Sequence, residues 1–177
     1  MKNTVKVSPE EGRQNDKLFQ FIIFKLAGED YGIHIEHVRE VTKTPKISRM
    51  PKTPSFIKGV ANVRGDLIAI IDLEERFQLK PLLQINTFDD GETYTIVVDA
   101  GTYNIGFVVK ELPSTINLPE AQIDKSADVI EKAKFKNKFI IGLGKMDGGR
   151  LVVLLDIFKI MTKIEINKVS SINKIKS

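Results

Sequence analysis

Few side chains in this sequence have the types and spacing that catalysis or metal binding requires. The two histidines, His34 and His37, lie three positions apart. A zinc or iron site needs three or four ligands with supporting partners, and no third ligand has an obvious place nearby. Neither histidine lies in the sequence context of a nucleophile and its base. We therefore expect no metal site, and we interpret both imidazoles as surface or partly buried side chains.

Two further motifs have a structural interpretation that is simpler than a chemical one. The sequence Gly142-Leu143-Gly144-Lys145 resembles part of a phosphate-binding loop, but Met146 stands where that loop has Ser or Thr. It also precedes a strand-like run, so no helix N-terminus would face a phosphate. Asp72 and Asp156 each precede a short segment that they are well placed to cap.

The absence of cysteine excludes a thiolate metal site, an iron–sulfur cluster, a cysteine nucleophile and a disulfide framework. With no catalytic constellation in view, we predict a non-catalytic binding protein without cofactors.

The elements that must position any functional residue are mostly short β-strands. Runs of β-branched and aromatic residues alternate with Gly, Pro, Asn and Asp, which is typical of an all-β barrel or sandwich. Segment 36–41 resembles a helical turn or two, because Val38 and Val41 lie three apart. Short helices are expected after Asp72 and Asp156. The expected strands are 19–27, 31–35, 57–63, 67–73, 93–100, 103–109, 139–145 and 150–155.

A weak internal repeat divides the chain into two similar units. Each unit has a glycine-led strand, a turn, an apolar strand, an aspartate and a short helix. Gly59 and Gly142 are 83 positions apart, and Asp72 and Asp156 are 84 apart. The apolar runs 67–71 and 151–155 do not alternate with polar residues, so both faces of these strands should be buried. Two β units that share a core would bury them.

Composition and charge narrow the class of partner. The 177 residues suggest one domain, and the 42% of hydrophobic residues can form a sizeable core. The net charge of +4 lies at the ends, with +1 in residues 1–17, +3 in residues 163–177 and none in the body. A neutral body speaks against nucleic acid as the partner. No run is long enough to span a bilayer, and residues 1–17 are polar and unlike a signal peptide, so we expect a cytoplasmic protein.

One internal stretch is basic without any acid. Between positions 41 and 65 the sequence contains six basic residues and no Asp or Glu: Lys43, Lys46, Arg49, Lys52, Lys58 and Arg64. The simplest interpretation of such a run is a solvated surface. Because it ends on an unusual hairpin, we also treat it as a candidate partner-facing surface.

That hairpin carries a resemblance to a known family. The sequence Asn62-Val63-Arg64-Gly65, followed by an apolar strand and Ile71-Asp72-Leu73, resembles the CheW family of chemotaxis coupling proteins. The match extends over about residues 17–162. It includes Tyr31-x-Ile33-x-Ile35-x-x-Val38-x-Glu40-Val41, Met50-Pro51-x-x-Pro54-x-Phe56-Ile57-x-Gly59-Val60, Gly106-Phe107-Val108-Val109 and Leu154-Leu155-Asp156-Ile157.

The resemblance implies both a fold and a function. CheW-like proteins fold as two five-stranded SH3-like β-barrels around a shared core, with a few short helices. They are non-catalytic adaptors at membrane-associated receptor arrays in the cytoplasm, where they couple methyl-accepting chemoreceptors to the regulatory domain of the histidine kinase CheA. The expected organisation is a flexible N-terminal arm (1–16), a CheW-like domain (17–162) and a basic C-terminal tail (163–177) that forms a frayed helix or stays disordered.

The resemblance also assigns residues to the two partner surfaces. The receptor-binding residues would be Glu40, Gly59, Asn62 and Arg64, with an ion pair expected between Glu40 and Arg64, although Gly59 and Asn62 also suit a purely structural role in the hairpin. The kinase-binding residues would be Ile22, Ile35 and Val38, for which an ordinary core position is the alternative. The sequence departs from the family pattern at Ala69, Lys110 and Pro113.

Two other functions stay open at this stage. One is a scaffold of the same family that serves another CheA-type pathway, such as type IV pilus motility. The other is a basic β-barrel that binds nucleic acid, whose affinity would fall steeply with salt.

Overall fold

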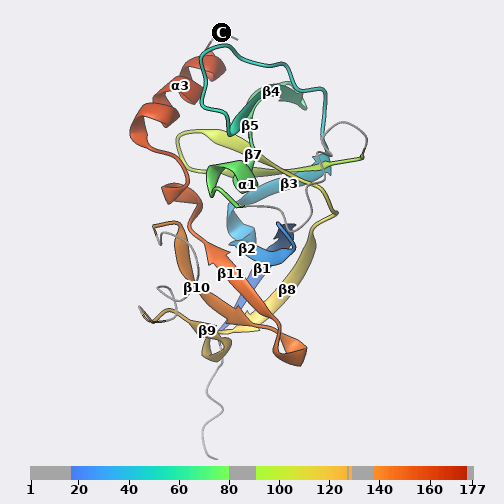
Figure 1. Cartoon of the computed structure of the whole chain (residues 1–177), viewed down its shortest axis with the longest axis vertical. Coiled ribbons are helices and arrows are strands. Elements are labelled where there is room, and N and C mark those ends of the chain that lie inside the picture. Colours follow the sequence, from blue (N-terminus) through green and yellow to red (C-terminus); the bar gives the residue numbers. More distant parts are fainter. Residues whose placement is uncertain (1–16, 80–90, 127, 129–137, 175–177) are drawn as a thin grey trace, which may run out of the picture.

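The computed structural model describes residues 17–79, 91–126, 128 and 138–174. The expected N-terminal arm, residues 1–16, lies outside these residues. The described residues form two β-sheets connected by short helices (Figure 1).

The first sheet has six strands in the order β8-β1-β2-β11-β10-β9. All neighbours are antiparallel except β2 and β11, which run parallel. The strands at the two ends of this order, β8 and β9, are separated in the chain by only a three-residue helix, so the chain closes the sheet toward a barrel. The strands are β1 (Leu18–Leu26), β2 (Glu29–His34), β8 (Ser114–Pro119), β9 (Ile123–Asp124), β10 (Ile140–Lys145) and β11 (Leu151–Leu155).

The second sheet has five strands in the order β3-β6-β7-β5-β4, with β5 and β7 parallel. The strands are β3 (Val38–Lys43), β4 (Ile57–Val63), β5 (Asp66–Ile71), β6 (Tyr94–Asp99) and β7 (Asn104–Val109). The helical elements are α1 (Leu73–Arg76), α3 (Lys163–Lys174) and the 3-10 helices η1 (Ile35–His37), η2 (Glu120–Gln122), η3 (Asp147–Gly149) and η4 (Ile157–Lys159).

The internal repeat is visible in the backbone. Both glycine-led strands contain a bulge, between Ile57 and Gly59 in β4 and between Ile140 and Gly142 in β10. At each bulge the glycine lies against the backbone of another segment. A Cβ on Gly59 would lie 2.2 Å from the carbonyl oxygen of Ser48, and a Cβ on Gly142 would lie 2.7 Å from that of Asp124. The aspartates at the ends of the following strands then cap α1 and η4.

Each sheet takes strands from both halves of the chain. The β1–β2 hairpin pairs with β8 and β11, whereas β3 and β5 pair with β6 and β7. The two sheets share the largest core cluster. It joins Tyr31 and Ile33 of the first sheet to Ile96, Ile105 and Phe107 of the second. The predicted all-β architecture of two units around a shared core is confirmed. The apolar runs are buried as expected, apart from the half-buried Leu67 and the exposed Leu151.

One expectation about local structure is wrong, and the structure decides between the two states expected for the C-terminal tail. Segment 36–41 is not a helical turn or two, because only η1 is helical and the chain continues as β3, paired with β6. The three-residue spacing of Val38 and Val41 spans a bulge in that pairing. Of the two states expected for the tail, the structure has the helix and not disorder over residues 163–174. These residues form α3, which buries Val169 in the main core.

The start of α3 is fixed by a reciprocal cap. Thr162 Oγ1 accepts from the Glu165 backbone N–H at 3.4 Å, and Glu165 Oε2 accepts from the Thr162 N–H at 2.7 Å. This is a capping box, and the spacing Thr162-x-x-Glu165 in the sequence is its signature. Glu165 also forms an ion pair of 3.3 Å with Arg76, the last residue of α1. No helix within the described residues is long and apolar enough to cross a membrane.

Candidate functional site

The hairpin of β4 and β5 has a two-residue turn that projects charge into solvent. Val63 and Asp66 pair across the turn, which leaves Arg64 and Gly65 at its centre with φ angles of 51° and 95°. Positive φ at both central residues is the geometry of the tight turns that match strand twist. Asn62 Oδ1 accepts from the Gly65 backbone N–H at 2.9 Å, so the asparagine side chain fixes the turn. The exposed arginine is therefore held on a defined backbone.

Arg64 pairs with Glu40 on the other edge strand of the sheet. Arg64 Nε donates to Glu40 Oε2 at 2.7 Å, and the exposed fractions of the two side chains are 81% and 20%. A second pair, Arg39 with Asp66 at 3.8 Å, also connects β3 to this hairpin. Exposed ion pairs of this kind contribute roughly 0–1 kcal/mol to stability. Their main effect is to orient a charged surface over β3 and the β4–β5 turn.

Gly59 belongs to the same hairpin but offers no side chain to a partner. It is buried, its φ is +145°, and its Cα lies beside the Ser48 carbonyl. Ser48 and Val60 exchange backbone hydrogen bonds of 2.8 and 2.9 Å. Any side chain at position 59 would push the segment containing Ser48 away from β4. The structure thus brings Glu40, Asn62 and Arg64 together at the surface and places Gly59 beneath the neighbouring loop.

The three predicted kinase-binding residues all contact the main core. Ile22 on β1 is only 8% exposed and is part of the main core cluster. Ile35 on η1 and Val38 at the start of β3 are half-buried and pack against the same cluster. Ile35 and Val38 retain surface for a partner, and Ile22 retains very little. Their role in binding stays a prediction.

The two histidines lie in an aromatic row. The His34 ring is 4.4 Å from Phe21 and 5.4 Å from Phe19, and the His37 ring is 5.1 Å from Phe158, measured between ring centroids. Burial lowers the pKa of His34, and the charge of Glu36 opposes this effect. Across the described residues, no three His, Asp or Glu side chains are grouped as a metal ion would require. The contacts of both imidazoles are those of packed side chains.

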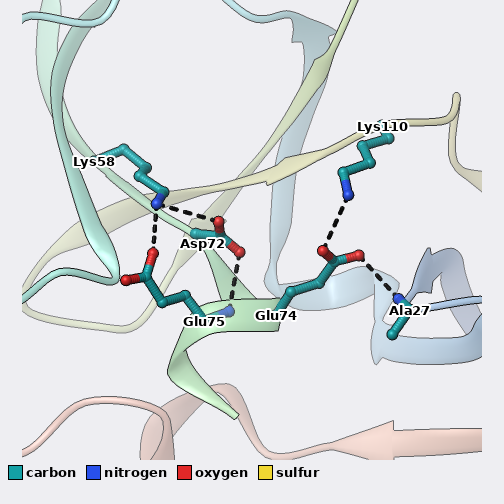
Figure 2. Close-up of polar contacts among 6 residues, drawn as sticks. All are labelled: Ala27, Lys58, Asp72, Glu74, Glu75 and Lys110. Carbon is teal, nitrogen blue, oxygen red and sulfur yellow. Dashed lines mark hydrogen bonds and ion pairs between the residues drawn. The ribbon is translucent and has the colours of Figure 1, made fainter. Parts of the chain in front are cut away.

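Sequence reasoning missed a polar network around α1 (Figure 2). Glu74 Oε1 accepts from the Ala27 backbone N–H at 2.9 Å, and Glu74 Oε2 pairs with Lys110 at 3.1 Å. Lys110 is one of the departures from the family pattern, and it has a carboxylate partner here. No single motif marks this network in the sequence, because its members come from four separate parts of the chain.

The other half of this network centres on Lys58. Its ammonium group contacts Glu75 and lies 3.4 Å from Asp72, while Asp72 also caps α1 by accepting from the Glu75 N–H at 3.2 Å (Figure 2). Burial alone would lower the pKa of Lys58, but the hydrogen bond to Glu75 and the charge of Asp72 outweigh it and raise the pKa. The hydrogen bond from Lys58 lowers the pKa of Glu75. Lys58 is thus held by its acidic neighbours.

Comparison with known proteins agrees with this architecture. A family model described as a CheW-like domain matches residues 20–165. Chemotaxis protein CheW of Klebsiella aerogenes is 33% identical over 155 residues, which cover 88% of this chain and 89% of that protein. Chemotaxis protein CheW of Helicobacter pylori is 32% identical, with coverage of 84% and 85%.

A solved structure gives the same result for the fold. The crystal structure of the scaffolding protein TtCheW from Thermoanaerobacter tengcongensis superposes with a TM-score of 0.71 at 26% identity, and the match covers 87% of this chain and 94% of that one. The family model spans nearly all of both sheets and the start of α3. The chain therefore belongs to the family of CheW-like domain proteins.

Proposed function

We propose that this protein is a chemotaxis adaptor that couples methyl-accepting chemoreceptors to a CheA-type histidine kinase. The observation that carries the proposal is the match of the CheW-like domain over residues 20–165. Relatives with the name chemotaxis protein CheW support it, as does the structural likeness to TtCheW, which is described as a scaffolding protein. In this role the protein binds and positions its partners and performs no catalysis. It works in the cytoplasm, at the receptor arrays.

The arrangement of surfaces suits a bridging role. The proposed receptor surface comprises Glu40 on β3 and Asn62 and Arg64 at the β4–β5 turn, which the Glu40–Arg64 ion pair joins. The proposed kinase surface comprises Ile35 and Val38, which pack against the main core, and Ile22, which is a buried member of that core. One core connects both regions, so the two partners would be held on one rigid body.

A binding assay with both partners tests the proposal. Purified protein should be captured by the regulatory domain of a CheA-type kinase and by a cytoplasmic tip fragment of a chemoreceptor, and it should bridge the two when both are present. Array proteins associate transiently, so the titration should extend to tens of micromolar. Failure to bind either partner in that range would overturn the proposal.

One relative supports a second candidate function. Protein FrzA of Myxococcus xanthus is 31% identical over 104 residues, covering 59% of this chain and 62% of that protein. This favours, as a second candidate, an adaptor of the same kind that serves another CheA-type kinase pathway. Loss of the gene separates the two candidates, since only the first requires a defect in chemotactic swimming.

A further inference from the structure

The structure divides the six cations of the acid-free stretch into two groups. Lys43 pairs with Glu92, Lys58 with Asp72 and Glu75, and Arg64 with Glu40. The three remaining cations are Lys46, Arg49 and Lys52, which are exposed and form no ion pair with any described residue. All three lie in residues 44–56, the loop between β3 and β4, which we call the basic loop.

The basic loop is held in place at several points along its length. Thr44 N–H donates to the Thr93 carbonyl at 2.9 Å, and Ile57 N–H donates to the Pro54 carbonyl at 3.0 Å. Between these ends, the Ser48 backbone bonds both ways to Val60, and Ile47 packs against a buried cluster. Three prolines, Pro45, Pro51 and Pro54, restrict the backbone further. The cations are therefore presented on an ordered scaffold, which reduces the entropy lost when a partner binds.

Gly59 controls the attachment of this loop. The Ser48 carbonyl occupies the space that a Cβ at position 59 would need, at a distance of 2.2 Å, and the φ of +145° is itself unfavourable for other residues. A substitution at Gly59 therefore moves the middle of the basic loop. Gly59 has no side chain to offer a partner, so its influence on binding is indirect, and its tightest contact is with the loop at Ser48.

We propose that the basic loop is a docking surface for an acidic protein segment, with carboxylates of the partner bound by Lys46, Arg49 and Lys52, and that Gly59 is a positioning residue for this surface. Charge complementarity identifies the partner's chemistry, because the loop contains no acid and its cations have no carboxylate partners within the described protein. The inference rests on the proposed function in taking the chemoreceptor tip as that partner. Three charges give only weak attraction to an anionic lipid surface, so we favour a protein.

The test compares two charge-reversal variants with the same change in net charge. The loop variant carries Lys46→Glu, Arg49→Glu and Lys52→Glu. The control variant carries Lys145→Glu, Lys163→Glu and Lys168→Glu, which are exposed positions elsewhere on the protein. All six substitutions lie on the surface, so both variants should fold, as circular dichroism and the melting temperature would verify.

Binding to a receptor tip fragment and to the kinase regulatory domain is then measured at low and high salt. The loop variant should bind the tip at least about tenfold more weakly than the wild type, with a flatter salt dependence, and should bind the kinase domain normally. The control variant should bind both like the wild type. Gly59→Ala should weaken tip binding in the same way while its kinase binding is retained.

The other outcomes separate this inference from the proposed function. Equal tip binding by the wild type and the loop variant overturns the inference and leaves the proposed function intact. Absence of wild-type binding to both partners overturns the two together. A third assay uses vesicles of phosphatidylglycerol and phosphatidylcholine. If the loop variant loses vesicle binding but keeps tip binding, the basic loop contacts lipid and the inference is wrong.

Discussion

At the scale of single residues, Arg64 combines an uncommon backbone conformation with a highly exposed charge. Its φ of 51° is in the left-handed region, where Asn and Gly are better tolerated than other residues. Asn62 compensates locally by accepting from the Gly65 N–H at 2.9 Å. An arginine at this position costs some backbone energy and contributes little stability in return. The stability of the turn therefore does not account for an arginine here, which supports the proposal that its side chain contacts a partner.

Replacement of Arg64 should separate binding from stability. Arg64→Asn keeps the turn geometry and removes the ion pair with Glu40, so the free energy of unfolding should change by less than about 1 kcal/mol. Binding to a receptor tip fragment should weaken about tenfold, as for an arginine at the centre of an interface. Urea unfolding and a binding titration measure the two effects. Unchanged tip binding by Arg64→Asn, with Arg64→Ala as a second variant, would exclude this residue from the receptor surface.

His34 should make stability depend on pH in the mildly acidic range. Burial lowers its pKa in the folded state below the ordinary value of 6.5, with smaller lowering effects from His37, Lys125 and Lys17 and an opposing effect from Glu36. The unfolded chain therefore binds this proton more readily, so stability is lost as the pH falls below 6.5.

Two measurements check this expectation. An NMR titration of the His34 ring should give an inflection below 6.5. His34→Phe, which keeps a ring against Phe19 and Phe21, should reduce the acid dependence of the melting temperature. An inflection at or above the ordinary value would contradict the burial of this ring.

At the scale of elements, the short helix α1 connects segments from both sheets. Its four residues include Glu74, which contacts the backbone of Ala27 after β1 and the side chain of Lys110 after β7 (Figure 2). Ala27 has a positive φ of 48°, an uncommon conformation for alanine. The carboxylate of Glu74 therefore ties the turn of the β1–β2 hairpin to the opposite sheet.

Loss of the hydrogen bond between the Ala27 N–H and the Glu74 carboxylate should destabilise the protein, although Glu74 is only half-buried. Glu74→Ala leaves the Ala27 N–H without its acceptor, which should cost about 1–3 kcal/mol in the free energy of unfolding. Glu74→Gln keeps an acceptor oxygen and loses only the charge toward Lys110, so it should cost less. Glu111→Ala, at an exposed position next to Lys110 in the sequence, is the control for loss of a carboxylate. Equal costs for Glu74→Ala and Glu111→Ala in urea unfolding would show that the junction contributes nothing.

The elements also show which parts of the fold can be predicted from sequence. Strands with continuous apolar runs, such as β5 and β11, and the aspartate caps of α1 and η4 follow from local patterns and are confirmed. The local spacing in β3 suggests a helical turn, and this is wrong because its conformation is decided by β6, which lies more than fifty positions later in the chain. The Glu40–Arg64 pair follows from the family resemblance, whereas the contact of Gly59 with Ser48 requires knowledge of where the loop folds back.

At the scale of the whole molecule, the two units cannot be separated along the chain. Residues before position 80 contain only the pairings β1–β2 and β4–β5 within themselves, as far as the described strands show. Four pairings cross to the second half: β1 with β8, β2 with β11, β3 with β6, and β5 with β7. Both parallel pairings are among these four, so each sheet is completed only by strands from the other half.

This exchange predicts that neither half folds alone and that the two halves fold together. Fragments 1–85 and 86–177, produced separately, should each lack a cooperative unfolding transition, because isolated hairpins are only marginally stable in water. An equimolar mixture should recover the β-sheet circular dichroism and a single transition, since the shared core of Tyr31, Ile33, Ile96, Ile105 and Phe107 forms only when both halves are present. The intact chain provides the reference signal. Cooperative unfolding of either fragment by itself would contradict this prediction. It would mean that this half is stable without the strand pairings to the other half.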